Sequence, residues 1–172
     1  MKLLIFRHGP AEPRSSDRPD ADRALTREGT EKTRLAAQGL ARIVDRPGII
    51  LTSPKRRARQ TAGILGDVFD LPIETADALA GDEVRPMEKM LRARPEDALA
   101  IVGHEPTLSR LAGQFLGVSP RDGELTLKKA GAIVLHVACR PSDPPGPNRL
   151  ELLLPGRVLR ALANPAAPSA AG

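Results

Sequence analysis

The sequence predicts an α/β sandwich with a mainly parallel central sheet. Short apolar runs at residues 2–6, 49–52 and 98–102 alternate with segments in which apolar residues recur at helical spacing. The run at 98–102 is apolar without alternation, as expected of a parallel strand that is covered on both faces. The last third predicts two further strands, which would give the sheet an antiparallel edge.

The first strand is predicted at residues 2–6, followed by a charged loop with Gly and Pro to about residue 24. Thr26 is expected to cap the next helix, and Pro47-Gly48 to end it. The apolar positions that define this helix recur at helical spacing: Ala36, Leu40, Ile43 and Val44. A strand over 49–52 comes next.

Ser53-Pro54 predicts the start of a second helix. Serine accepts hydrogen bonds from the free amides of a first turn, and proline at the first helical position lacks a donor that would be unpaired anyway. A loop at residues 70–72 ends this segment. The inward stripe is predicted to comprise Ala58, Ala62, Leu65 and Phe69.

The second half predicts a helix at 83–94, the strand at 98–102 and a helix opened by Pro106. Strands at about 130–139 and 149–154, joined by a loop at 141–147, are expected to form a hairpin or a connected edge pair. We expect one domain over residues 1–163 and a flexible tail over 164–172. The inward positions of the two helices are Val84, Met87 and Leu91, then Leu108, Leu111, Ala112, Phe115 and Leu116.

The composition is that of a soluble globular protein, with 41% hydrophobic and 27% charged residues. Three Phe and no Trp or Tyr leave few platforms for stacked bases, so the net charge of +5 does not indicate a nucleic-acid partner. The single Cys139, which we interpret as a buried strand residue, excludes an internal disulfide and a multi-cysteine metal site. No apolar run approaches the roughly 20 residues of a membrane span. Cytoplasmic localisation is therefore expected.

Two of the three histidines, His8 and His104, directly follow predicted buried strands. In open α/β sheets ligands bind beyond the carboxyl ends of the strands. Each histidine has a glycine beside it, which permits close approach of the backbone to a ligand. The alternative for each is a loop histidine that only bonds backbone carbonyls. His136, inside an apolar run, is predicted to be a strand residue with a satisfied bond rather than a catalytic one.

Residues 53–61 place several cations in the first turns of a predicted helix. Free amides and the macrodipole there favour an anion and disfavour cations, so a bound anion would explain these basic residues. A solvated surface is the alternative interpretation. Arg57 lies near the inward stripe, whereas Lys55 and Arg56 can point to water.

Four motifs occur in order along the chain: Arg7-His8-Gly9, Leu25-Thr26-Arg27-Glu28-Gly29, Ser53-Pro54 through Arg57-Ala58 to Gln60-Thr61-Ala62, and Val102-Gly103-His104. Over about residues 2–155 the chain thereby resembles the histidine phosphatase superfamily. Its short length, its Leu-Thr-x-x-Gly motif and its lack of a large helical insertion are most similar to SixA-type phosphohistidine phosphatases. The resemblance implies a three-layer α/β/α sandwich of the phosphoglycerate mutase-like kind.

The resemblance further implies that His8 is the nucleophile that becomes phosphorylated, while Arg7, Arg57 and His104 surround the phosphoryl oxygens. Phosphoryl transfer depends mainly on positioning and charge stabilisation, which two guanidinium groups and an imidazole can supply. Two nearby arginines also disfavour the cationic form of His8. No metal or other cofactor is expected, because these side chains provide the positive charge.

Larger members of the superfamily use a carboxylate from a segment between two motifs as general acid, and Asp82 and Glu83, which lie between the third and fourth motifs, are the candidates here. The alternative is that they cap or begin the helix at residue 83. A phosphohistidine substrate depends less on such an acid, because its leaving imidazole can carry its own proton near neutral pH.

The expected function is removal of phosphate from phosphohistidine in a signalling protein, such as a histidine phosphotransfer domain. A chain without a helical lid should have an open pocket, which suits a side chain presented by another protein. One alternative is a phosphomonoesterase that hydrolyses a small phosphate ester with the same four residues. The other is a binding module for phosphorylated ligands without turnover.

Overall fold

Six strands form one sheet in the order β3-β2-β4-β1-β5-β6 in a computed structural model that describes residues 1–118, 125–138, 140, 143 and 146–164. β1 pairs in parallel with β4, β4 with β2 and β2 with β3, whereas β5 and β6 are antiparallel. The predicted parallel sheet with an antiparallel edge is confirmed. The strands are β1 (Lys2–Arg7), β2 (Ile50–Thr52), β3 (Ile73–Thr75), β4 (Ala98–Gly103), β5 (Ala132–His136) and β6 (Arg149–Leu154).

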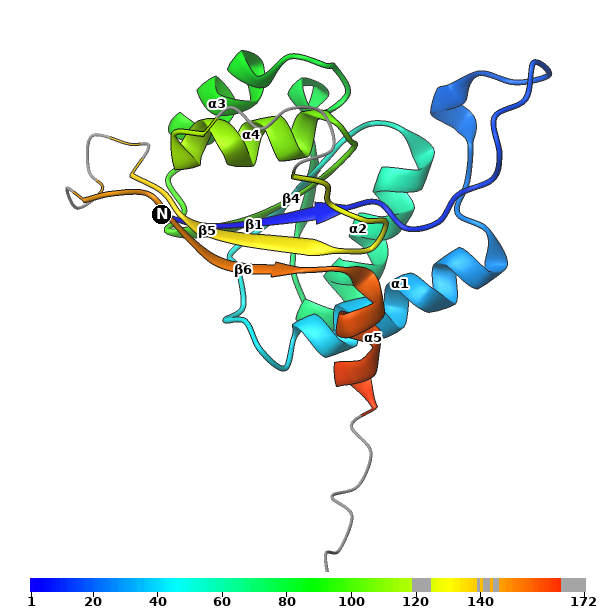
Figure 1. Cartoon of the computed structure of the whole chain (residues 1–172). Coiled ribbons are helices and arrows are strands. Elements are labelled where there is room, and N and C mark those ends of the chain that lie inside the picture. The colour runs from blue at the N-terminus through cyan, green and yellow to red at the C-terminus, as the bar shows by residue number, and fades with distance from the viewer. Residues whose placement is uncertain (119–124, 139, 141–142, 144–145, 165–172) are drawn as a thin grey trace, which may run out of the picture.

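Helices cover both faces of this sheet, which gives the predicted three-layer α/β/α sandwich (Figure 1). α3 (Val84–Arg92) and α4 (Thr107–Leu116) cover one face, and α1 (Arg27–Leu40), α2 (Arg56–Phe69) and α5 (Gly156–Ala163) cover the other. Within the described residues, no helix is long and apolar enough to cross a membrane.

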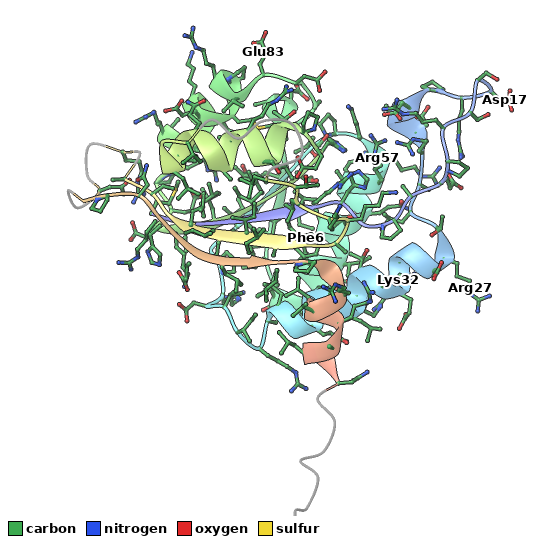
Figure 2. All side chains as sticks on the ribbon, in the orientation of Figure 1. Phe6, Asp17, Arg27, Lys32, Arg57 and Glu83 are labelled. Carbon is green, nitrogen blue, oxygen red and sulfur yellow. The ribbon has the colours of Figure 1, made fainter. Side chains whose placement is uncertain are left out.

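Side chains of β1 alternate between two hydrophobic cores, one on each face of the sheet. Leu3 and Ile5 pack in the core under α3 and α4, and Leu4 and Phe6 pack in the core under α1, α2 and α5. Phe6 is fully buried near the middle of the molecule (Figure 2). The continuous apolar sequence of this strand is therefore explained by burial on both sides.

The predicted start of the helix after Thr26 is confirmed, but its predicted end is wrong. Thr26 accepts a hydrogen bond from the amide of Gly29 at 2.9 Å. The helix ends at Leu40, and Ile43, predicted to face inward, is 42% exposed. Amide bonds to carbonyls three residues back tighten this last turn, and Pro47 disfavours helical backbone before it.

The prediction that Ser53-Pro54 starts a helix is wrong, because α2 begins at Arg56. Ser53 instead prolongs β2, and its amide donates to the carbonyl of Val102 at 3.0 Å. The predicted inward stripe of α2 is buried. Ser53 is therefore held by its backbone hydrogen bond to β4 and does not cap a helix.

Several elements were not predicted from the sequence: β3, the helix α5 and 3-10 turns at Asp20–Asp22 and Asp77–Leu79. α5 begins at Gly156, directly after β6 and Pro155. Cys139, much of the loop at 141–147 and residues 165–172 of the predicted tail lie outside the described residues. β5 is shorter than predicted, at Ala132–His136.

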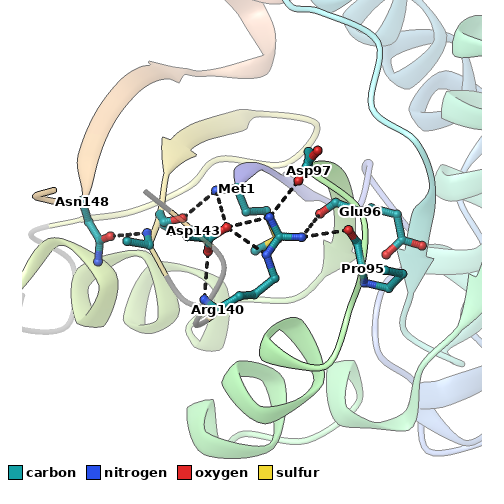
Figure 3. A network of polar contacts seen from close by, with 9 residues as sticks. Met1, Pro95, Glu96, Asp97, Arg140, Asp143 and Asn148 are labelled. Carbon is teal, nitrogen blue, oxygen red and sulfur yellow. Dashed lines mark hydrogen bonds and ion pairs between the residues drawn. The ribbon is translucent and has the colours of Figure 1, made fainter. Parts of the chain in front are cut away.

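A polar network fastens the hairpin of β5 and β6 near the amino ends of β1 and β4 (Figure 3). Arg140 donates to the carbonyls of Pro95 and Glu96 and binds the carboxylates of Asp97 and Asp143. The amino group of Met1 also contacts the Asp143 carboxylate, at 3.3 Å. These bonds tie three chain segments together at one edge of the sheet, leaving its carboxyl edge for other residues.

Replacing Gly39 with alanine should destabilise the protein, because α1 and α5 touch at this residue. A Cβ at Gly39 would lie 1.8 Å from the carbonyl oxygen of Leu159. We expect a loss of about 1–3 kcal/mol in the free energy of unfolding, measured by urea denaturation. Gly63→Ala in α2 is the matched control, because its Cβ would meet nothing within 4 Å and alanine favours helix. Equal effects of the two substitutions would show that α5 does not pack there.

Candidate active site

Three neighbouring parallel strands deliver side chains to one edge of the sheet. Arg7 at the end of β1 is in register with Gly103 of β4, and Thr52 of β2 with Val102. The next residues, His8, His104 and Ser53, therefore lie side by side beyond the strands. A hydrogen bond of 3.1 Å from the amide of His8 to the carbonyl of Gly103 joins two of these loops.

The rings of His8 and His104 face each other with centroids 5.0 Å apart and planes tilted by 54°. Both side chains are buried. Nδ1 of His8 lies 2.7 Å from the carbonyl oxygen of Gly9. A carbonyl only accepts, so Nδ1 carries the proton and Nε2 keeps a free lone pair. His8 is thereby prepared to act as a nucleophile through Nε2.

Both histidines are neutral at pH 7. Burial lowers the pKa of His8 to about 4; the bond to Gly9 opposes this change, and the charges of Arg57, Arg7 and Lys129 add to it. Burial also lowers the pKa of His104 to about 2, with further contributions from His8, Arg57 and Lys55. A neutral imidazole carries one ring proton, so the position of that proton decides what each ring can do.

Arg57 enters the site from the first turn of α2 and is 3% exposed. Its two terminal nitrogens bind Asp20: Nη1 donates to the Asp20 carbonyl at 2.6 Å and Nη2 to the carboxylate at 2.9 Å. Nε of Arg57 is buried and has no partner among the described residues. One edge of the guanidinium is thus held by Asp20, and the edge that bears Nε is open to another acceptor.

Arg7 comes from the end of β1, and its Nη1 donates to the carbonyl of Leu127 at 2.8 Å. Burial lowers the pKa of Arg7, and the charge of Glu105 acts in the opposite direction. Its Nε is buried without a partner in the described part of the chain. The same holds for Nδ1 of His104, so unsatisfied polar atoms of three predicted site residues occur at this edge of the sheet. A tetrahedral oxyanion would satisfy such donors.

Sequence reasoning missed Asp20, which lies in the 3-10 turn of the loop after β1. Its carboxylate also binds Nε of Arg23 at 2.8 Å and of Arg14 at 3.3 Å. Burial raises the pKa of Asp20, but Arg57 and Arg23 outweigh this and lower it to about 2. The acidic pair in Asp20-Ala21-Asp22 was visible in the sequence, but nothing local identified an arginine 37 residues away as its partner.

Thr61 connects the first and third motifs. Its hydroxyl donates to the carbonyl of Arg57 at 2.8 Å and accepts from the amide of Gly9 at 3.1 Å. A side chain at position 9 would collide with Thr33, since a Cβ there would lie 1.9 Å from the Thr33 hydroxyl oxygen. The glycine of Arg-His-Gly is therefore needed for close packing on α1 and α2.

Asp82 and Glu83 are exposed. Glu83 is the N-cap residue of α3, although its side chain makes no capping bond, and it points outward at the top of the molecule, away from Arg57 (Figure 2). His136 is confirmed as a strand residue with a satisfied bond, to Glu151 of β6. Among the described residues, no group of three or more His, Cys, Asp or Glu side chains could hold a metal ion.

Comparison with known proteins identifies both a family and a fold. The family model of the histidine phosphatase superfamily (branch 1) matches residues 3–90. An uncharacterized protein from Picosynechococcus sp. is 38% identical over 142 residues, which are 79% of this chain and 85% of that protein.

Two solved structures share the fold. The protein histidine phosphatase SixA complexed with tungstate has a TM-score of 0.76 and 24% identity, over 92% of this chain and 99% of that chain. A mycobacterial glucosyl-3-phosphoglycerate phosphatase has a TM-score of 0.64 and 16% identity, over 88% of this chain and 97% of that chain.

Replacing His8 with asparagine should reduce the acid sensitivity of the fold. Since the pKa of about 4 in the folded protein lies below the ordinary value of 6.5, the unfolded chain binds more protons between these pH values. The part of the free energy of unfolding that depends on His8 should therefore be greatest above pH 6.5 and fall by about 2–3 kcal/mol on acidification to pH 4. His8→Asn removes this contribution, and urea denaturation at several pH values measures it. An unchanged slope in His8→Asn would contradict the assignment.

Replacing Asp20 with alanine should loosen the loop between β1 and α1, because its bonds to Arg57 fasten that loop to α2. Trypsin should then cut after Arg14 about fivefold faster, as expected for a loss of about 1 kcal/mol. The control is Asp22→Ala, since Asp22 is an exposed acid in the same turn. Equal cleavage rates in the two variants would show that the Asp20 contacts do not hold the loop.

Proposed function

The chain belongs to the histidine phosphatase superfamily, and from that premise we propose that it removes the phosphoryl group from phosphohistidine in a protein, through a covalent phosphohistidine at His8. The observation that carries this proposal is the fixed proton of His8. The bond from Nδ1 to the Gly9 carbonyl leaves the lone pair of Nε2 as the only basic ring position.

The first step is in-line attack of Nε2 of His8 on phosphorus. As the new N–P bond forms, the bond from phosphorus to the leaving nitrogen breaks, and a substrate imidazole with a proton on its other nitrogen leaves as a neutral ring. Arg7, Arg57 and His104 stabilise the charge on the phosphoryl oxygens. The proton on Nδ1 of His8 stays bonded to Gly9 throughout.

Water completes the cycle by attacking the phosphorus of phosphorylated His8. The P–Nε2 bond breaks, the electron pair returns to Nε2, and the oxygen of water becomes part of inorganic phosphate while its proton passes to phosphate or solvent. Neutral His8 is restored. The arginines provide the positive charge that metal ions supply in other phosphoryl-transfer enzymes.

The exposed position of Asp82 and Glu83 supports a phosphohistidine substrate over a phosphate ester. An alkoxide is a poor leaving group and needs a proton from the enzyme, whereas an imidazole does not. The proposed partner is therefore a protein that presents a phosphorylated histidine on its surface, such as a histidine phosphotransfer domain of a signalling relay.

A small-molecule phosphomonoesterase is the second candidate. The likeness in fold to glucosyl-3-phosphoglycerate phosphatase, a protein named for a small phosphate ester, favours it. The same four residues would bind the phosphoryl group, and Asp82 or Glu83 would have to move toward the leaving oxygen. The two candidates thus differ in their need for a carboxylate.

The deciding experiment compares a phosphorylated histidine phosphotransfer protein with an alkyl phosphate, both in the presence of a chelator. We expect the wild type to release inorganic phosphate from the protein substrate, and His8→Asn to reduce the rate at least about a thousandfold. Asparagine can still donate to the Gly9 carbonyl, so the loop should keep its shape. Acid-labile, base-stable phosphate on the wild-type chain would identify the phosphohistidine intermediate.

The double variant Asp82→Asn with Glu83→Gln is the matched control, and it should retain hydrolysis of phosphohistidine. Rapid hydrolysis of the ester alone, dependent on these carboxylates, would instead establish the small-molecule phosphatase. Binding of tungstate or phosphate without turnover of either substrate would leave the binding module as the function.

A further inference from the structure

The position of the single proton on His104 decides whether this ring attracts or repels an oxyanion. Its Nε2 lies 2.9 Å from the hydroxyl oxygen of Ser53, and its Nδ1 is buried without a partner among the described residues. If the proton lies on Nδ1, that atom is a free donor. With the proton on Nε2, Nδ1 would instead present a lone pair, which repels a phosphoryl oxygen.

Ser53 is well placed to decide between these two forms. It follows β2 directly, is fully buried, and is anchored through its amide to Val102 at 3.0 Å. Its hydroxyl oxygen already accepts from the amide of Lys55 at 3.3 Å. With that lone pair directed at an N–H, the one hydroxyl hydrogen is available to Nε2 of His104.

We propose that Ser53 is a positioning residue, which donates its hydroxyl hydrogen to Nε2 of His104 and so keeps the ring proton on Nδ1, ready for an oxyanion. His104 then becomes the counterpart of His8. The carbonyl of Gly9 accepts a hydrogen bond from one ring nitrogen of His8, which leaves the lone pair of the other nitrogen free for attack. Ser53 donates a hydrogen bond to one ring nitrogen of His104, which leaves the N–H of the other nitrogen free to bind the phosphoryl group.

Burial makes this arrangement necessary. A protonated imidazole would donate from both nitrogens, but His104 is held neutral by its burial and, to a smaller extent, by His8, Arg57 and Lys55. Since Nδ1 of His104 has no acceptor among the described residues, a donor to Nε2 is what can hold the proton on Nδ1. The last step, donation to a phosphoryl group, rests on the proposed function; the location of the proton is a property of the protein alone.

The test is ¹⁵N NMR of protein labelled at histidine nitrogens, which distinguishes protonated from bare ring nitrogens. We expect the wild type to show Nδ1 of His104 protonated and Nε2 bare at pH 7. In Ser53→Ala the proton should move toward Nε2, the position that an unconstrained histidine side chain favours. Ser53→Thr, which keeps the hydroxyl, should restore the wild-type pattern.

Ser109→Ala is the matched control, because Ser109 is also buried but its hydroxyl donates to Glu105 at 2.6 Å. This variant should leave the His104 spectrum unchanged. A second measurement is the affinity for tungstate, which we expect Ser53→Ala to weaken about tenfold to a hundredfold, the usual effect of losing one hydrogen bond to a charged group.

A wild-type His104 protonated on Nε2 would overturn the proposal without any variant. So would a proton that stays on Nδ1 in Ser53→Ala. Since the spectrum needs no substrate, its outcome is separate from the proposed function: inactivity on phosphohistidine with the expected spectrum refutes only the function, and turnover with the opposite spectrum refutes only the role of Ser53.

Discussion

Parallel pairing among β1, β4 and β2 brings His8, His104 and Ser53 together at the candidate site. The register that matches Arg7 with Gly103 and Thr52 with Val102 makes the following residues neighbours, although they are far apart in the chain. Backbone hydrogen bonds continue one residue past the strands, from His8 to Gly103 and from Ser53 to Val102. A shift of one residue would turn these side chains to the other face, so the hydrophobic pattern that fixes the register also fixes the chemistry.

Burial of the imidazole and guanidinium groups at this edge of the sheet gives the site its chemical properties, and it lowers the stability of the fold. Removal from water keeps both imidazoles neutral and leaves guanidinium donors without partners, which strengthens any interaction with an oxyanion. Neutral rings carry one proton each, and their functions then depend on the backbone carbonyl of Gly9 and on the hydroxyl of Ser53. Small groups beside the histidines thus matter as much as the charged ones.

The loop after β1 contributes Asp20 to the site. Asp20 occupies one edge of the Arg57 guanidinium and is itself held by Arg23, so the loop is fastened where the phosphoryl group is expected. The polar network around Arg140 likewise fastens chain segments together at the opposite edge of the sheet, where it joins the residues before β4 to those after β5. Among the described residues, only the edge with the histidines combines buried arginines with donors that have no partner.

The sequence predicted most strands of the sheet, though not β3, and the inward stripes of its main helices, because these depend on periodicity. Motifs within a few residues predicted His8, His104, Arg7 and Arg57 as site residues. The sequence misplaced the start of α2, since Ser53-Pro54 has the local chemistry of a helix cap but pairs with β4 instead. It also missed Asp20 and α5, whose partners lie far away in the chain. Which atoms of these four residues already have a hydrogen-bond partner, and which do not, could not be predicted from the sequence, because that depends on groups that the register of the sheet brings together.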